Sequence, residues 1–149
     1  MSDLNILKAT TKDIPQIYNL VRELAIFENE PDAVKIGIKD FANAFKDKIF
    51  DSIVAFDNET IVGVTIFYIT FSTWRGRCLY LEDFYVQPKY RKNKLGQRLF
   101  EAYLDEAKAL CCNQVKWQVL DWNQIGVNFY AKNNVMFEKN WWNCKLYFN

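Results

Sequence analysis

The chain contains no histidine among its 149 residues. Histidine is the usual general base of Ser-His-Asp and Cys-His sites, and it is a frequent metal ligand. Its absence excludes these two kinds of nucleophilic catalysis and most metal sites. Any acid–base chemistry must therefore come from carboxylates, tyrosine, lysine, cysteine or water.

The chain also lacks a strong charge balance and a long apolar run. Its net charge is +1, which indicates no polyanionic partner, so a basic patch must be local. The first ten residues, MSDLNILKAT, have neither the cationic flank nor the apolar core of a signal peptide. No apolar stretch approaches the roughly 20 residues of a membrane helix. These absences predict a cytoplasmic protein that does not enter the membrane.

The cysteines are few and are not spaced for metal binding. None of the four stands in a C-x-x-C pair, and Cys111 is adjacent to Cys112. This spacing favours neither a disulfide framework nor a zinc site, so we expect no metal. It predicts that the cysteines serve as small buried hydrophobic residues.

The residues that are present indicate a packed globular protein. Half of them are hydrophobic and 17% are aromatic, which excludes a disordered chain. The length predicts a single domain over residues 1–149. The apolar periodicity predicts helices that follow a capping box at Thr10–Asp13 and span 39–49, 95–110 and 123–134. It predicts strands over 4–9, 52–56, 60–70, 77–86, 114–120 and 142–148. This order indicates an α/β fold with a mixed sheet and helices on its faces.

A cluster of cations surrounds the start of the helix expected from residue 95. Five of the ten residues from 89 to 98 are Lys or Arg, and none is acidic. A helix N-terminus presents unpaired N–H groups and a partial positive charge, so a phosphate group is its natural ligand. A solvated basic loop is the alternative interpretation.

The turn resembles the pyrophosphate-binding loop of the GNAT superfamily of N-acetyltransferases, written [QR]-x-x-G-x-[GA]. The sequence here is RKNKLG, residues 91–96, in which Arg91 and Gly96 match and Lys94 replaces the middle glycine. Lys92 also stands where the diamine acetyltransferases usually have glycine. These two lysines raise the question of how tightly the loop holds acetyl-CoA.

A wider resemblance is to the diamine (spermidine/spermine) acetyltransferase family. It is carried by RELAIFE (22–28), FSTWRGRCLYLEDFYV (71–86) and DWNQIGVNFYAKNN (121–134). The resemblance implies a fold in which the fourth and fifth strands splay apart. It also implies transfer of an acetyl group from acetyl-CoA to a primary amine of a small cationic acceptor, such as a diamine, a polyamine or a thialysine-like compound.

The resemblance further implies the residues that hold the cofactor. Backbone groups of three consecutive strand residues would bind the pantetheine arm in the manner of an added strand. The turn from Arg91 to Gly96 would wrap the pyrophosphate. The cofactor residues implied in this way are Phe84, Tyr85, Val86, Arg91, Lys92, Asn93, Lys94, Leu95, Gly96 and Asn123.

Two residues match the family's proton-transfer groups. Tyr130, in the NFY motif, matches the general acid that protonates the departing CoA thiolate. Glu82 matches the residue proposed to accept the proton of the amine, through water. The alternatives are an aromatic core residue for Tyr130 and a salt bridge at the strand end for Glu82.

Glu28, Trp74, Glu82 and Asp83 match positions that line the amine channel, and Trp142 matches more loosely. Acids and an indole face suit a cationic acceptor. Consecutive strand residues face opposite sides of a sheet. Glu82 and Asp83 can therefore serve one pocket only if a β-bulge re-aims one of them.

Three other functions stay open at this point. The chain could be a CoA-binding module without catalysis, or an enzyme of the same fold that acetylates protein N-termini or lysines. A nucleic-acid binder is disfavoured by the near-neutral charge and the single short basic patch. Family members commonly form dimers, so we expect a homodimer. The aromatic residues near the C-terminus fit either a dimer interface or an ordinary core.

Overall fold

Residues 4–148 are described by a computed structural model, in which the chain forms two compact units that meet at Gln118 and Val119. The first unit contains a 3₁₀ turn η1, helices, strands and a second 3₁₀ segment η2. In chain order they are β1 (Leu4–Lys8), η1 (Thr11–Asp13), α1 (Ile14–Phe27), α2 (Ile38–Lys46), β2 (Asp51–Asp57), β3 (Thr60–Ser72), β4 (Gly76–Val86), η2 (Pro88–Asn93), α3 (Leu95–Ala109) and β5 (Gln114–Trp117). The second unit contains α4 (Gln124–Lys132). The expectation of a single domain stays a prediction.

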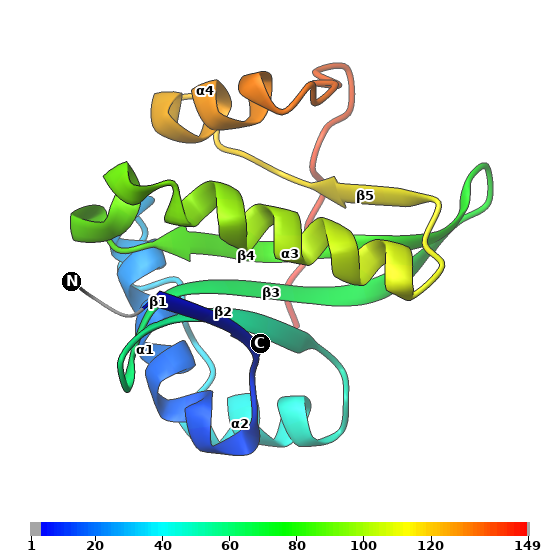
Figure 1. Ribbon diagram of the computed structural model, residues 1–149. Helices are drawn as coiled ribbons and strands as arrows, with labels where there is room; N and C mark the ends of the chain where they lie inside the picture. The colour runs from blue at the N-terminus through cyan, green and yellow to red at the C-terminus, as the bar shows by residue number, and fades with distance from the viewer. Residues whose placement is uncertain (1–3, 149) are drawn as a thin grey trace. The chain divides into compact units, whose positions relative to one another are not determined.

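The five strands of the first unit form one mixed sheet in the order β1-β2-β3-β4-β5. The first four strands pair antiparallel, and β5 joins β4 in parallel. A parallel neighbour needs a crossover connection, and α3 provides it. The α/β class with a mixed sheet is thus confirmed, and Figure 1 shows α3 lying along β3 and β4.

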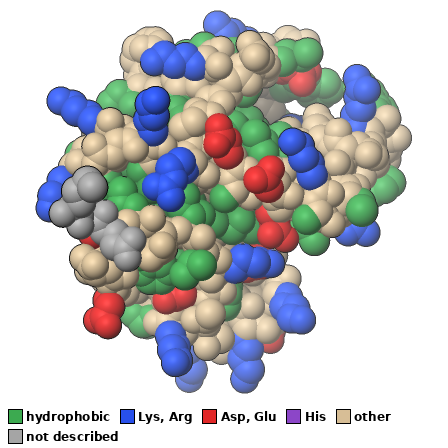
Figure 2. Space-filling view, viewed as in Figure 1, with side chains coloured by type: hydrophobic (Ala, Val, Ile, Leu, Met, Phe, Trp, Pro, Cys, Tyr) green, Lys and Arg blue, Asp and Glu red, His purple; other side chains and the backbone are tan. Residues whose placement is uncertain are grey.

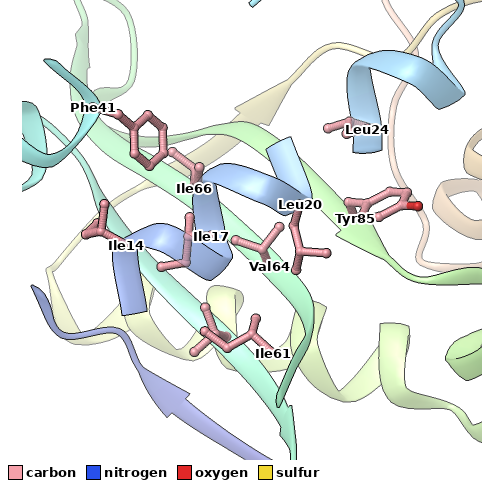
Figure 3. Packing of buried hydrophobic residues seen from close by; sticks show 10 residues of the cluster. Ile14, Ile17, Leu20, Leu24, Phe41, Ile61, Val64, Ile66 and Tyr85 are labelled. Atoms are coloured by element: carbon pink, nitrogen blue, oxygen red, sulfur yellow. The ribbon is translucent and has the colours of Figure 1, made fainter. Parts of the chain in front are cut away.

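The core on the first face of the sheet is built between α1, α2 and the central strands. Alternate residues of β3, among them Val64 and Ile66, point toward Ile17 and Leu20 of α1, and Phe41 of α2 closes the cluster. Figure 3 shows these side chains converging in the space between helix and sheet. Helical period on one side and strand alternation on the other bring the two apolar faces together.

The opposite face of the sheet is covered by α3. Phe67 of β3 and Phe84 of β4 contact Tyr103 and Phe100 of this helix. The helix comes so close to the sheet at Gly63 that a Cβ atom there would lie 3.2 Å from a methyl group of Leu99. This close packing fixes the position of α3 and therefore of the turn that precedes it.

Local signals in the sequence are confirmed at several helix ends. The Asp13 carboxylate accepts a 2.8 Å hydrogen bond from the backbone N–H of Thr10, as expected for the capping box. Asn123 caps α4 by accepting a 3.1 Å bond from the N–H of Gly126, and Asn134 has the expected left-handed conformation, with φ 59°.

The strand expected over residues 142–148 is wrong. This segment carries no strand in the structure, and several of its aromatic side chains are exposed, including Trp142 and Phe148. Aromatic residues have a high β-propensity because their side chains fit a pleated surface. A strand also needs a partner for its backbone hydrogen bonds, which propensity does not describe. Residues 119–148 contain no strand that could pair with it.

The expectation for the cysteines is correct for Cys78 alone. All four are free, and Cys78 is buried, but Cys111 and Cys144 are exposed and Cys112 is partly exposed. Cys111 has a φ of 59° in the turn that ends α3, where the chain runs at the surface. Among residues 4–148, no helix has the length and apolar content that crossing a membrane requires.

We predict that shortening a core side chain of α1 lowers stability far more than shortening an exposed one on the same helix. Leu20 is only 2% exposed, so Leu20→Ala should cost about 2–5 kcal/mol through lost burial and the cavity left behind. Ile26 is 61% exposed, and Ile26→Ala should change stability by less than about 0.5 kcal/mol. Urea unfolding measures both, and equal losses would contradict the packing described.

Candidate functional site

A β-bulge in the middle of β4 gives the site its shape. Asp83 is opposite Ile66 of β3, but Phe67, the next residue of β3, is opposite Leu81. Glu82 is therefore an extra residue without a partner across the ladder. One inserted residue reverses the alternation of faces from that point on. Glu82 and Asp83 consequently face the same side of the sheet. The alternation of strand residues required such a bulge if the two acids were to share one pocket.

Both carboxylates line a pocket of about 290 Å³ on the face covered by α1 and α2. Its remaining walls are almost entirely apolar. They come from α1, α2, the segments on either side of α2, and β3, and include Val21, Val34, Ile36, Phe41, Phe50 and Ile66. A pocket of this kind encloses the carbon skeleton of a small molecule and offers it two acids at one side.

The charges around Asp83 oppose its ionisation. Desolvation of the carboxyl group, followed by the negative charges of Glu82 and Glu28, raises the pKa of Asp83 from 3.8 to about 7. Glu28 ends α1, and its own pKa is raised by burial. The structure thus places Glu28, Glu82 and Asp83 close enough for their charges to interact, and the roles in acceptor binding expected for them stay predictions. Such a cluster of acids attracts a cation.

Tyr68 is a residue of this pocket that the sequence did not single out. Its hydroxyl donates a 3.3 Å hydrogen bond to Oε2 of Glu82, and its ring stacks on Tyr80 at 5.5 Å. Burial and the charge of Glu82 raise the pKa of Tyr68 to about 12, so it stays a donor at neutral pH. The alternation of β3 places Tyr68 on the face of Ile66, but nothing in the sequence specifies the bulge that turns Glu82 toward it.

The end of β4 leaves the sheet open on one side. Strand β5 pairs only with Cys78–Leu81, and it ends at Trp117. On this edge, β4 continues from Glu82 to Val86 beyond the four residues that pair with β5. This is the separation of the fourth and fifth strands that the resemblance implied (Figure 1). Strand backbone that lacks a paired neighbour on one edge can bind an extended ligand by adding it as a strand.

The side chains of the three residues expected to hold pantetheine point into the fold. Phe84 packs on Phe100, and Tyr85 and Val86 are buried. Their side chains therefore fix β4 in place, and only their backbone groups are available for a ligand. This arrangement is compatible with the backbone role expected for them, which stays a prediction.

The basic turn follows β4 directly. Lys92, Asn93 and Lys94 are exposed, whereas Leu95 is buried and starts α3. Lys94 occupies the middle glycine position and has φ 57° and ψ 15°, the left-handed conformation. The position therefore does require the conformation that glycine adopts freely, and a side chain here costs on the order of 1 kcal/mol.

Arg91 is turned back toward the protein. Its Nε donates a 2.8 Å hydrogen bond to the carbonyl of Val86, and its guanidinium lies over the rings of Phe27 and Tyr85, at 5.1 and 5.6 Å. These contacts tie the turn to β4 and α1. Within residues 91–96, all of which the structure describes, the exposed cations are Lys92 and Lys94, whereas the contacts of Arg91 hold the turn in place.

Glu23 of α1 extends this connection and was also missed from the sequence. It accepts hydrogen bonds of 3.3 Å from the Tyr85 hydroxyl and of 3.2 Å from the side-chain amide of Gln87. The sequence offered one signal for the role of Glu23: it is a charged residue on the helix face next to the buried apolar stripe of α1. Together with Arg91, Glu23 fixes the direction in which the chain leaves β4.

Tyr130 and Asn123 belong to the second unit, where Tyr130 lies in α4 and Asn123 immediately precedes this helix. Tyr130 is 7% exposed, and its ring contacts Phe129 edge to face at 5.5 Å. The Asn123 side chain caps the helix. The roles expected for them, general acid and cofactor contact, stay predictions.

Trp74 is not brought to the acid pocket. It is 85% exposed at the tip of the β3–β4 hairpin. Glu82 lies six residues along β4 from Gly76, the first residue of the strand, or roughly 20 Å at the usual rise of a strand. The role of Trp74 in acceptor binding therefore stays a prediction, and this arrangement does not support it. Trp142 is also exposed.

Comparison with known proteins gives one family and several relatives. The model of the acetyltransferase (GNAT) family matches residues 14–134. The thialysine N-epsilon-acetyltransferase of Mus musculus is 33% identical over 140 residues, which cover 87% of this chain and 82% of the relative. The spermidine/spermine N(1)-acetyltransferase-like protein 1 of Homo sapiens is 31% identical over 91% of this chain, which corresponds to 21% of that longer protein.

Solved structures share the fold at lower identity. A protein of Clostridium acetobutylicum described as a predicted acetyltransferase, crystallised with acetyl-CoA, has a TM-score of 0.82 and 19% identity, and the match covers 96% of each chain. An aminoglycoside acetyltransferase from an uncultured soil sample has a TM-score of 0.83 at 16% identity, with 98% of this chain and 97% of that chain covered. At such identities the likeness establishes the fold alone.

We predict that Lys94→Gly is more stable than Lys94→Ala, by up to about 1 kcal/mol, because only glycine relieves the left-handed conformation. Both variants remove the charge, so both should weaken binding of acetyl-CoA severalfold at low salt. Thermal unfolding and a CoA titration measure the two effects. Lys92→Gly is the matched control, since Lys92 has no positive φ and should gain no stability. Unchanged CoA affinity in both Lys94 variants would exclude a phosphate contact.

Proposed function

We propose that this chain, which belongs to the acetyltransferase (GNAT) family, transfers the acetyl group of acetyl-CoA to a primary amine of a small cationic acceptor. The acceptors considered are diamines, polyamines and thialysine-like aminoalkyl compounds. The names of two relatives support this class of acceptor. One is a thialysine N-epsilon-acetyltransferase, and the other is named as similar to spermidine/spermine acetyltransferases. The transfer proceeds by direct attack of the amine in a ternary complex.

The observation that carries the proposal is the pocket formed at the bulge. Two carboxylates that ordinary strand alternation would separate lie on one wall, and a third, Glu28, acts on them electrostatically. A volume of about 290 Å³ suits a small acceptor. The acids attract its ammonium group, and the apolar walls accommodate its carbon chain.

The cofactor is proposed to bind where β4 runs beyond β5. Backbone groups of Phe84, Tyr85 and Val86 hold the pantetheine arm, and the turn from Arg91 to Gly96 takes the pyrophosphate. Lys92 and Lys94 add charge to the N–H groups at the start of α3, while Arg91 keeps the turn in place. Asn123 is proposed as a further cofactor contact. The reaction moves only an acetyl group and protons, so the proposal includes no metal.

The chemistry requires two proton transfers. An alkyl ammonium group with a pKa near ~10.4 must lose its proton before it can attack the thioester. The Glu82–Asp83 pair is proposed to accept that proton, and Glu82 is the member that the family resemblance favours. The amine nitrogen then bonds to the acetyl carbon, and the C–S bond to CoA breaks. Tyr130 is proposed to protonate the departing thiolate.

Two alternatives belong to other functional classes. A GNAT-fold enzyme that acetylates protein N-termini or lysines would need an open groove, and the acid pair here lies in a small pocket instead. A non-catalytic CoA-binding module would bind cofactor without turnover. On the face shown in Figure 2, lysines and arginines are interspersed with acidic and apolar side chains, which lends no support to nucleic-acid binding.

We also propose a cytoplasmic homodimer. The support for a dimer is the exposed aromatic segment near the C-terminus, which includes Trp141, Trp142, Tyr147 and Phe148. Exposed apolar groups in this number are common at subunit interfaces. The proposed location is supported by the small-molecule acceptor, thialysine, that is named for a relative.

We predict that diamines, polyamines and thialysine-like amines are acetylated with a higher kcat/KM than monoamines without a second charge or polar group. The difference should be about tenfold or more, the value of one charged hydrogen bond. A thiol-release assay with acetyl-CoA and a panel of amines measures it. Preferred turnover of peptide N-termini would favour the protein-acetylating alternative. Binding of CoA without turnover of any amine would favour the non-catalytic module.

We predict that Tyr130→Phe lowers kcat by roughly 100-fold, the usual scale of general acid catalysis. The substitution keeps the ring, so the melting temperature and the stabilisation by CoA should remain close to those of the unmodified protein. Phe129→Leu serves as a control on the same helix. If Tyr130→Phe keeps its full rate while chemistry limits turnover, Tyr130 has a packing role and water or another group supplies the proton.

A further inference from the structure

The two acids of the bulge occupy different environments. Glu82 is exposed and accepts the hydrogen bond from Tyr68, so one of its carboxylate oxygens is already engaged. Asp83 is less exposed than Glu82, and no side chain within residues 4–118 donates a hydrogen bond to its carboxylate. Asp83 is therefore the carboxylate that lines the pocket without a side-chain donor from residues 4–118, and the two acids are placed to divide acid–base roles between them.

From this geometry we infer that Asp83 is the group that removes the proton from the acceptor amine, and that Glu82, which the Tyr68 hydroxyl engages, supplies the neighbouring negative charge that assists it. This assignment rests on the proposed acetyl transfer. It differs from the family resemblance, which gives the role of base to Glu82. The step is a proton transfer from R–NH₃⁺ to the Asp83 carboxylate, which leaves R–NH₂ and a neutral carboxyl group.

The charged and titratable groups that face Asp83 support this division of roles. Glu82 of β4 and Glu28 at the end of α1 are both negative and both raise its pKa. The tyrosines on the neighbouring positions of the sheet, Tyr68 and Tyr80, have raised pKa values and are neutral near pH 7. The pocket walls contributed by α2 are apolar.

A base must be ionised before reaction and must hold the proton afterwards. With a pKa of about 7, Asp83 is substantially ionised at neutral pH and binds a proton far better than an ordinary carboxylate. In a protein without histidine, the bulge thus provides a group that titrates near neutrality.

The decisive experiment is the pH dependence of kcat/KM for Glu82→Gln and Asp83→Asn. It is measured from about pH 5.5 to about pH 9, because the acid limb of the profile differs in this range according to which carboxylate is the base. If Asp83 is the base, Glu82→Gln lowers the pKa of Asp83 by removing a negative neighbour. The acid limb of the profile then moves to lower pH, and the activity of the variant relative to the unmodified enzyme rises as pH falls.

Asp83→Asn removes the base itself. Its kcat should fall by roughly 100-fold, and the remaining rate should climb with pH toward the pKa of the amine, because only the free amine can then react. Asp105→Asn, which removes an exposed carboxylate on α3, is the matched control and should leave the profile unchanged.

The opposite slope overturns the inference. If Glu82 is the base, Glu82→Gln loses activity most at low pH, where free amine is scarcest, and Asp83→Asn keeps the acid limb. A second result would also overturn the inference: the unmodified enzyme acetylates amines, and both variants have the same pH profile as the unmodified enzyme. This result would leave the proposed acetyl transfer unaffected. A failure of the unmodified enzyme to acetylate any amine would instead contradict the proposed function.

A thermal-unfolding series tests the environment of Asp83 independently of activity. Because folding raises the pKa of this carboxyl group from 3.8 to about 7, its ionisation opposes folding increasingly between these values. Asp83→Asn should therefore raise the melting temperature by several degrees above pH 7 and by nothing near pH 4. A melting temperature that is lower than that of the unmodified protein at every pH would contradict an unpaired carboxylate at this position.

Discussion

The candidate site depends on one residue inserted into β4. Without the bulge, Glu82 would face away from Asp83, and the pocket beneath α1 and α2 would contain a single carboxylate. With it, two negative charges share an apolar enclosure and a third acts from the end of α1. The mutual repulsion of these groups is unfavourable for the fold, and it persists because the sheet and its helices over-determine the backbone there.

The same strand supplies a second functional feature within a few residues of the bulge. β5 accompanies β4 only as far as Leu81, so the backbone of β4 becomes available on one edge where the acid pair begins. The turn that follows is held against β4 and α1 by Arg91 and Glu23. The unpaired edge of β4 therefore begins at the acid pair, within the same strand.

The lack of histidine makes the electrostatics of the pocket more consequential. Free carboxylates titrate far below neutrality and alkyl amines far above it, so neither is suited to exchanging protons at neutral pH. Desolvation and like charges bring a carboxyl group into the useful range. At the basic turn, too, an unfavourable feature accompanies a useful one. Lys94 has a strained left-handed backbone conformation, and its side chain adds a positive charge to the turn.

The sequence by itself determined the features that depend on neighbouring residues. Hydrophobic period located α1, α3 and β1 to β4, and short-range hydrogen bonding located the Thr10–Asp13 capping box, the Asn123 cap and the left-handed Asn134. The order of these elements indicated the mixed sheet, and family resemblance added the separation of β4 from β5. Only the tertiary structure decided that a bulge turns Glu82 toward Asp83, that Tyr68 binds Glu82, and that Trp74 stands far from the pocket. It also decided that residues 142–148 form no strand, because register, bulges and strand pairing depend on partners distant in the chain, whereas propensity describes each segment alone.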